Sequence, residues 1–275
     1  MKITVLIENT GESPLIHEHG LSFYIEYQDH IYLLDTGSTS AFMKNAEILG
    51  ISLDHIQTSI LSHGHYDHSG GFYDYLIKYP MIQVYAMKNI FEEHYSTSGN
   101  SLHNIGVSNQ LYLLKERFIF IEQVTQINQN VFLVPHIMNK KKVYDHQLYV
   151  KRNQQLIYDD FSHELSLVFH TNKGLVVLNS CSHSGIVHII EDIETLFPHQ
   201  RIYAYIGGLH LKRKREKQEI CAFSSPELFE LSTYLKHHVQ FLFSGHCTGE
   251  IALKHLENDM GNHFYRLTTG QIIEL

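Results

Sequence analysis

The chain has 275 residues, of which 43% are hydrophobic and 18% are charged, and this composition excludes a disordered or collagen-like chain. The formal net charge of −8 argues against a nucleic-acid partner bound by phosphate attraction, and three cysteines without a CxxC pair exclude a disulfide scaffold. We see no secretory signal and no run of about 18 apolar residues, so we expect a cytoplasmic protein without membrane contact. Histidine is the unusual component, at 22 positions.

The first part of the chain predicts short strands that alternate with amphipathic helices. Alternation or short apolar runs indicate strands at Ile3–Ile7, Leu21–Tyr27, Ile31–Leu34, Thr58–Leu61 and Ile82–Ala86. Helical spacing indicates helices over Phe72–Lys78 and over Ser40–Leu49, the latter capped by Ser38 or Thr39. Residues 92–110 are rich in Ser, Asn and Gly, and they predict a long surface loop that is either unstructured or folded over a pocket to contact the substrate.

The second part of the chain repeats this pattern. Strands are expected at the C-terminus and at Asn130–Pro135, Leu165–His170, Leu175–Asn179, Ile202–Ile206 and Gln240–Phe243. Helices are expected over Ile186–Leu196, Glu250–Asn258 and Pro226–His237, the last of these capped by Ser224 or Ser225. No Pro-, Gly- or Ser-rich linker divides the sequence, so we expect a single domain over residues 1–275.

Polar loops that contain His or Asp follow four of the predicted strands. These loops carry Asp35, the segment 63–68, His183 and His246. Ligands gather outside the carboxyl ends of strands in helix-covered sheets, because strand ends anchor the loops rigidly. The sequence therefore predicts one shared pocket at this edge.

The segment His63-x-His65-x-Asp67-His68 places four potential metal ligands within six residues. Alternate residues of an extended chain point the same way, so His63 and His65 can reach one ion. Asp67 and His68 lie just beyond, where the chain turns, and can face a second ion. Imidazole and carboxylate donors suit Zn²⁺, Fe²⁺ or Mn²⁺. A hydrogen-bonded polar loop is the alternative, but four ligand-type residues so close together favour a metal site.

These motifs resemble those of the metallo-β-lactamase superfamily. The resemblance begins with His63-x-His65-x-Asp67-His68 and the upstream Leu34-Asp35-Thr36-Gly37. It narrows to a branch of metal-dependent hydrolases that includes dihydropterin–ribofuranosylaminobenzene-phosphate synthases. The motifs that narrow it, which extend the match over residues 8–249, are Glu18-His19-Gly20-Leu21-Ser22, Cys181-Ser182-His183-Ser184-Gly185, Gly207-Gly208-Leu209-His210-Leu211 and Gly245-His246-Cys247-Thr248-Gly249. The resemblance implies a four-layered αβ/βα sandwich with a metal site at the rim between two mixed sheets.

The resemblance also implies ligands for two divalent metal ions. His63 and His65 would hold the first ion, and Asp67, His68 and His246 would hold the second. A bound ion lowers the pKa of water from 15.7 toward about 7, and the metal-bound hydroxide would attack a carbonyl carbon or a phosphorus. Asp67 would also act as a catalytic residue by orienting this nucleophile.

The chain departs from the superfamily at the position of the aspartate that bridges both ions in most relatives. Cys181 stands at this place, either as a soft ligand or as a small buried residue. We therefore expect one or two ions per chain, most simply zinc, with manganese or iron as alternatives. Further ligands expected from the resemblance are His183 and, for the first ion, His163, with His136 as a weaker choice. The alternative for His163 and its neighbour Glu164 is that they orient a ligand and do not bind the ion.

Several residues near these motifs are predicted to contact the substrate. His210 follows a Gly-Gly pair at a strand end, and it either contacts the substrate and donates a proton to the leaving group or makes a local hydrogen bond. His19 in the first loop is a similar candidate, and Asp35 is expected to accept a hydrogen bond from a ligating histidine. Lys212 and Arg213 begin a run of basic residues that is either a solvated segment or a phosphate-binding site.

The sequence thus predicts a metal-dependent hydrolase for a small, phosphorylated or cyclic ester. Two alternatives stay open. One is a transferase that joins a dihydropterin to ribofuranosylaminobenzene phosphate, as the synthases of this branch do. The other is a non-catalytic, metal-stabilised protein that binds a small ligand. Five retained ligands speak against the last alternative, because a structural metal site is normally closed by four.

Overall fold

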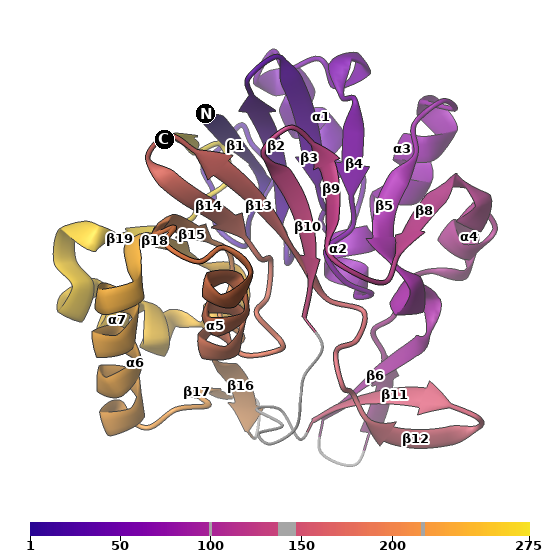
Figure 1. Cartoon of the computed structure of the whole chain (residues 1–275). Helices are drawn as coiled ribbons and strands as arrows, with labels where there is room; N and C mark the ends of the chain where they lie inside the picture. The colour runs from indigo at the N-terminus through magenta and orange to yellow at the C-terminus, as the bar shows by residue number, and fades with distance from the viewer. Residues whose placement is uncertain (99–100, 137–146, 216–217) are drawn as a thin grey trace.

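The computed structural model describes residues 1–98, 101–136, 147–215 and 218–275, and two seven-stranded sheets form its centre (Figure 1). In spatial order the first sheet contains β20 (Ile272–Glu274), β1 (Lys2–Ile7), β2 (Ser22–Tyr27), β3 (His30–Leu34), β4 (Thr58–Ile60), β5 (Val84–Met87) and β8 (Phe118–Ile121). The second contains β19 (Phe264–Arg266), β18 (Val239–Ser244), β15 (Ile202–Ile206), β14 (Gly174–Leu178), β13 (Leu165–Thr171), β10 (Val131–Pro135) and β9 (Thr125–Asn128).

Both sheets are mixed. In the first sheet β20, β1, β2 and β3 pair antiparallel, whereas β3, β4, β5 and β8 pair parallel. In the second sheet β14, β15, β18 and β19 pair parallel, whereas β14, β13, β10 and β9 pair antiparallel. The parallel strands are nearly continuous apolar runs, as expected for strands that are covered on both faces.

Three apolar clusters hold four layers together. The inner faces of the two sheets pack on each other, and Phe23 and Leu167 lie in this central cluster. The outer face of the first sheet packs on α1 (Ala41–Ile48) and α3 (Phe72–Lys78). The outer face of the second packs on α5 (Ile186–Leu196), α6 (Ser225–His238) and α7 (Glu250–Met260). This arrangement confirms the predicted αβ/βα sandwich.

Most predicted elements are present, with bounds shifted by one or two residues. The helices α3 and α5 and the strand β15 have the predicted bounds. Helix α1 begins after Ser40, not after Ser38 or Thr39, and the expected C-terminal strand is two strands, β19 and β20. Ser224 precedes α6 as predicted, and its backbone N–H and its hydroxyl both donate to Glu227. No helix of the described residues is long and apolar enough to cross a membrane.

Two small β-structures were not expected. The prediction of an irregular loop over residues 92–110 is wrong, because β6 (Glu93–Ser98) and β7 (Ser101–Asn104) form a hairpin that joins β11 (Leu148–Arg152) and β12 (Gln155–Tyr158) in a four-stranded sheet. The alternative that this segment lies at a pocket agrees with the structure, since Ser96 and His103 line a cavity. The basic run beginning at Lys212 forms β16 (Lys212–Arg215), which pairs antiparallel with β17 (Gln218–Cys221). Figure 1 shows both small sheets at the same end of the molecule, beyond the two large sheets.

We expect Gly70→Ala to destabilise the protein by about 3 kcal/mol, because the added methyl group overpacks a closed site. A Cβ atom on Gly70 would lie 1.9 Å from the carbonyl oxygen of Ser38, and its own backbone φ of −64° is otherwise acceptable for alanine. Gly50→Ala is the matched control, since a Cβ atom there meets nothing within 4 Å and only its φ of +69° costs about 1–2 kcal/mol. Urea unfolding measures the stability of both variants. An equal loss of stability in Gly70→Ala and Gly50→Ala would contradict the steric argument.

Candidate metal centre

The structure brings the predicted polar loops together at one end of the two large sheets. His63 and His65 follow β4, and Asp67 and His68 lie in the short helix α2 (Tyr66–Ser69). The loops after β14 and β18 supply the remaining ligand candidates, Cys181, His183 and His246. All of these side chains are buried.

The first group of ligand candidates surrounds His68. Its Nε2 atom lies 3.2 Å from Nε2 of His246 and 3.2 Å from Sγ of Cys181. Asp67 completes the group, since its Oδ2 atom lies 3.4 Å from Nε2 of His246 and 3.7 Å from Nε2 of His68. Two imidazole nitrogens at such a distance repel each other unless a proton or a cation lies between them.

The second group contains His63, His65 and His183. The ring centroid of His183 lies 4.9 Å from that of His63 and 4.7 Å from that of His65. Ligand atoms of His63, His183 and Cys181 lie within 4.8 Å of one another, and Cys181 forms a similar group with His68 and His246. Cys181 therefore lies between the two groups, where most relatives are expected to have the bridging carboxylate.

Hydrogen bonds that Nδ1 donates orient three of these histidines. Nδ1 of His68 lies 2.8 Å from Asp35 Oδ2, and Nδ1 of His246 lies 2.9 Å from the side-chain oxygen of Asn9. Nδ1 of His63 lies 2.8 Å from the hydroxyl of Ser62. Each acceptor keeps the ring proton on Nδ1 and leaves the Nε2 lone pair for the centre, as in metal-binding histidines generally.

Asp35 accepts several of the hydrogen bonds that support His68 and the neighbouring loops. The buried carboxylate accepts hydrogen bonds from the backbone N–H of Ser62 at 2.8 Å and from the hydroxyls of Ser62 and Ser180 at 2.7 and 2.6 Å. Because Ser62 Oγ donates to Asp35, it is free to accept from His63. The structure places Asp35 where the sequence predicted it, beside a candidate ligand.

Two buried glutamates fix the backbone of the ligand loops. Glu8 accepts a hydrogen bond from the N–H of His246 at 2.6 Å, and Glu164 accepts from the N–H groups of His183 and Ser184 at 2.7 and 2.8 Å. Glu164 is the neighbour of the predicted candidate His163, whereas a role for Glu8 was not predicted. The signal was present, because Glu8 directly follows a strand, as Asp35 does.

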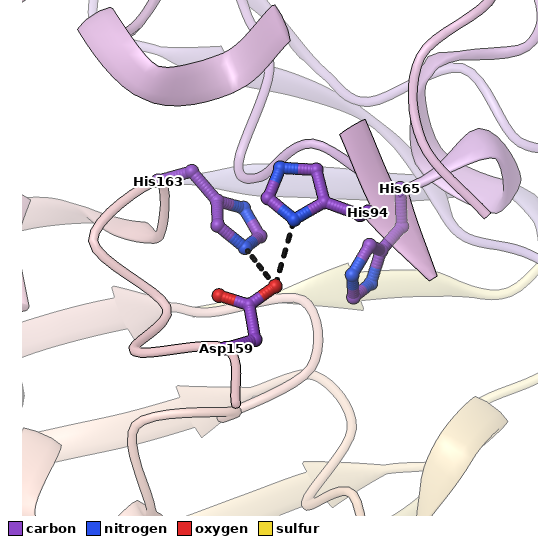
Figure 2. A group of neighbouring side chains, drawn as sticks. All are labelled: His65, His94, Asp159 and His163. Carbon is purple, nitrogen blue, oxygen red and sulfur yellow. Dashed lines mark hydrogen bonds and ion pairs between the residues drawn. The ribbon is translucent and has the colours of Figure 1, made fainter. Parts of the chain in front are cut away.

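His163 lies beside the centre, close to the rings of His65 and His63. Its ring centroid is 5.4 Å from that of His65 and 6.0 Å from that of His63. Its Nδ1 accepts a hydrogen bond from the N–H of Gly64 at 2.9 Å, and its Nε2 lies 3.4 Å from Oδ2 of Asp159. His163 forms a cluster with His65, His94 and Asp159 (Figure 2). Asp159 and His94 were not predicted from the sequence.

His136, the weaker ligand candidate, lies in a separate network. Its Nδ1 is 3.0 Å from Asp192 Oδ2 and its Nε2 is 2.7 Å from the hydroxyl of Ser166. Both ring nitrogens are therefore engaged by neighbouring side chains. In this arrangement His136 supports the second sheet and offers no free donor to a metal ion.

A cavity of about 430 Å³ opens onto the ligand candidates. Its wall contains residues of both small sheets together with the four predicted substrate contacts, His19, His210, Lys212 and Arg213. The His210 ring lies 4.1 Å from the His183 ring, and Nε2 of His19 lies 3.2 Å from Oδ2 of Asp67. Lys212 pairs with Glu219 at 3.2 Å, whereas Arg213 donates to the carbonyl oxygen of His210 at 3.1 Å.

Burial and charge set the protonation of the candidate ligands. Burial lowers the pKa of His63, His65 and His183 well below the usual value, and neighbouring rings lower it further, so these rings stay neutral. Burial raises the pKa of Asp67, but the facing histidines together hold it well below its usual range. Neutral imidazoles and an ionised carboxylate are the forms that bind metals.

His68 differs from the other rings. Burial lowers its pKa, but the carboxylates of Asp67 and Asp35 together raise the pKa above its usual value. The two carboxylates therefore favour a proton on this ring, whose Nε2 atom faces His246. Several imidazoles, a carboxylate and a thiol around one point fit a divalent transition-metal ion, which would take the place of that proton.

Comparisons with known proteins agree with the fold. Residues 17–137 match the model of the metallo-beta-lactamase superfamily. The 7,8-dihydropterin-6-methyl-4-(beta-D-ribofuranosyl)-aminobenzene-5'-phosphate synthase of Methanocaldococcus jannaschii is 28% identical, over 100% of this chain and 96% of its own. An uncharacterised protein of the same organism is 27% identical, over 98% of this chain and 99% of its own. The structure of Tm1679, a metal-dependent hydrolase of the beta-lactamase superfamily, is 29% identical with a TM-score of 0.82, over 100% of this chain and 99% of its own.

Fold and site together define an αβ/βα sandwich protein with a buried, histidine-rich candidate metal centre at the rim of its two sheets. The chain has the metallo-β-lactamase fold, and its residues 17–137 match the model of that superfamily. Its similarity to a synthase and to a metal-dependent hydrolase confirms the branch that the sequence motifs resemble.

Proposed function

We propose that the protein is a metal-dependent hydrolase that cleaves a small phosphoester, a phosphodiester or a cyclic ester. One observation carries the proposal. Two groups of buried ligand candidates meet at Cys181, beside a cavity whose wall also contains Lys212 and Arg213. One or two divalent ions, most simply zinc, would be held by His63, His65, His183, Asp67, His68, His246 and Cys181.

The chain's own residues have defined tasks in this proposal. A divalent ion in the centre would supply Lewis acidity and lower the pKa of water toward about 7. The ionised Asp67 carboxylate, held by His19 at 3.2 Å, accepts a hydrogen bond from the attacking water and orients it. His210 lies in the cavity wall and donates a proton to the leaving oxygen. Water thus adds across the ester bond, its oxygen to phosphorus and a proton to the leaving group.

The basic wall favours a phosphorylated substrate, and Arg213 is the residue that tests this. We expect Arg213→Ala to raise KM for bis(p-nitrophenyl) phosphate about 10- to 100-fold, because one charge-assisted hydrogen bond contributes about 1.5–3 kcal/mol. Hydrolysis of the neutral p-nitrophenyl acetate is expected to change little. The matched control is Arg201→Ala. It removes an exposed arginine that donates a hydrogen bond to the backbone carbonyl oxygen of Lys173. Equal losses on both substrates would contradict a phosphate contact.

A synthase activity is the second candidate, and the full-length similarity to the Methanocaldococcus jannaschii synthase favours it. The same cavity would then hold a dihydropterin diphosphate and ribofuranosylaminobenzene phosphate. Incubation of the metal-loaded protein with both compounds separates the two activities. A condensed product supports the synthase, and release of diphosphate with only the hydrolysed pterin supports the hydrolase.

Metal content is the first test of the proposal. Elemental analysis of protein purified without chelators and without a His-tag is expected to give one or two first-row metal ions per chain. Two ions support a binuclear centre, and one supports a mononuclear centre. Protein that takes up no Zn²⁺, Mn²⁺ or Fe²⁺ after reconstitution would overturn the proposal. Metal without turnover on any ester or phosphodiester would favour the non-catalytic ligand-binding alternative.

A further inference from the structure

We propose that Asp159 is a positioning residue for His65, and that the buried cluster of His65, His94, Asp159 and His163 is a hydrogen-bonded support and not an additional cation site. The inference rests on the proposed function, because it takes His65 to be a metal ligand. It concerns Asp159 and His94, which lie outside the ligand motifs and which the sequence analysis did not predict.

Four buried side chains from three segments of the chain form this cluster (Figure 2). His94 lies in β6 of the small sheet, and Asp159 and His163 lie in the connection between β12 and β13. One ligand-type atom from each of the four residues lies within 4.8 Å of the others. Figure 2 shows the three imidazole rings around the carboxylate of Asp159. By composition alone, three histidines and one aspartate would suit a tetrahedral zinc ion.

The hydrogen bonds assign the protons and argue against such an ion. The N–H of Gly64 donates to Nδ1 of His163, so the proton of the neutral His163 ring lies on Nε2, the atom that faces Asp159. The short contact of 2.7 Å between Nδ1 of His94 and Asp159 Oδ2 places a second proton toward the carboxylate. The N–H of Phe161 donates to the other carboxylate oxygen at 2.8 Å. Nitrogens that carry protons do not ligate metals, so these donors leave Asp159 as a hydrogen-bond acceptor.

His65 completes the arrangement. Its Nε2 atom is buried and has no hydrogen-bond partner among the described residues, while its ring lines the cavity. His63, His68 and His246 each have an acceptor for their second nitrogen, in Ser62, Asp35 and Asn9. Ligand-type atoms of His65 and Asp159 lie within 4.8 Å of each other, so in this proposal the Asp159 carboxylate takes the corresponding part for His65. A metal ion bound through Nδ1 of His65 leaves an Nε2–H that requires an acceptor on this side.

The cluster also connects the metal-ligand loop to the cavity wall. His163 holds the backbone N–H of Gly64, between the two candidate ligands His63 and His65. A Cβ atom on Gly64 would lie 3.0 Å from Nε2 of His94, so the loop and β6 are in contact there. Two residues beyond His94, Ser96 lines the cavity. The same strand therefore supports the ligand loop and forms part of the substrate wall.

The test is the affinity of the whole protein for Co²⁺, measured by competition with a chelator and by its visible absorption. Asp159→Asn keeps the shape of the side chain but removes the carboxylate. We expect this variant to bind Co²⁺ 10- to 100-fold more weakly than the wild type, as is found for substitution of residues that orient metal ligands. The visible spectrum of the bound Co²⁺ should change. The number of Co²⁺ ions bound per chain at saturation should stay the same. Asp259→Asn is the matched control, because Asp259 contacts His255 and Ser232 in a remote helix pair, and its Co²⁺ affinity should not change.

The outcomes separate the two proposals. If the wild-type protein binds no Co²⁺, the proposed function fails. If the wild type binds Co²⁺ and Asp159→Asn binds it equally well with the same spectrum, only the positioning role is wrong. Loss of one full equivalent of Co²⁺ in the variant would show that the cluster is a cation site, which also overturns the inference.

A measurement on the wild-type protein covers the case in which the variant does not fold. With ¹⁵N-labelled histidine and ¹¹³Cd²⁺, the cadmium coupling of the His65 ring reports the ligating nitrogen. We expect coupling to Nδ1 and a proton on Nε2. Coupling to Nε2, or to a ring nitrogen of His94 or His163, would overturn the assignment.

Discussion

His68→Ala is expected to remove metal from the protein and to lower turnover more than about 100-fold, since loss of a residue that merely orients a ligand already costs 10–100-fold. The His68 ring has the central place in the candidate centre. Its Nε2 atom lies 3.2 Å from both His246 Nε2 and Cys181 Sγ, and its Nδ1 atom lies 2.8 Å from Asp35. Metal content by elemental analysis and turnover of bis(p-nitrophenyl) phosphate measure the two effects.

The control for this variant is another histidine that faces a carboxylate. His188 lies on α5, and its Nε2 atom is 3.5 Å from Asp192 Oδ2, away from the cavity wall. We expect His188→Ala to keep the metal content and turnover of the wild type. A His68→Ala protein that is folded, by its circular dichroism, and that retains full metal content would contradict the ligand assignment.

The sequence predicts the layers of this protein well because their signals are local. Helix α5 and strand β15 show the apolar periodicity of elements that pack on one core, so their bounds agree with the structure. Strand β6 and its neighbours have no such pattern. Their side chains are mostly polar or exposed, as in β7, and they pair in a small sheet outside the main core. Strand β16 is a run of basic residues, and its pairing with β17 overrides its low strand propensity.

The candidate metal centre also contains some residues that the sequence marks and others that it does not. The segment from His63 to His68 is visible in the sequence because its donors lie within six residues. The residues that orient these donors are distant in the chain. Asn9 reaches His246 across 237 positions, and Asp159 approaches His94 across 65. No local pattern connects such pairs, since only the folded sheets bring them together.

Asp35→Ala is expected to lower the free energy of unfolding of the metal-free protein by about 3–5 kcal/mol, because it leaves several buried donors without their acceptor. The donors are the N–H and hydroxyl of Ser62, the hydroxyl of Ser180 and Nδ1 of His68. The backbone adds to the cost, since Asp35 has a φ of +60°, which aspartate tolerates better than alanine. At about 2–4 °C per kcal/mol, the melting temperature should fall on the order of 10 °C.

Two further variants identify the cause of that loss. Asp35→Asn preserves the tolerance of positive φ and one acceptor oxygen, so its loss should be smaller than that of the alanine variant. Asp54→Ala removes an exposed carboxylate that accepts only a 3.3 Å contact from Ser52 among the described bonds, and its stability should stay within about 0.5 kcal/mol of the wild type. Chemical unfolding of metal-free protein measures all three variants. If Asp35→Ala loses no more stability than Asp54→Ala, the hydrogen bonds of Asp35 do not stabilise the metal-free fold. The role of Asp35 would then be confined to orienting His68 toward the ion.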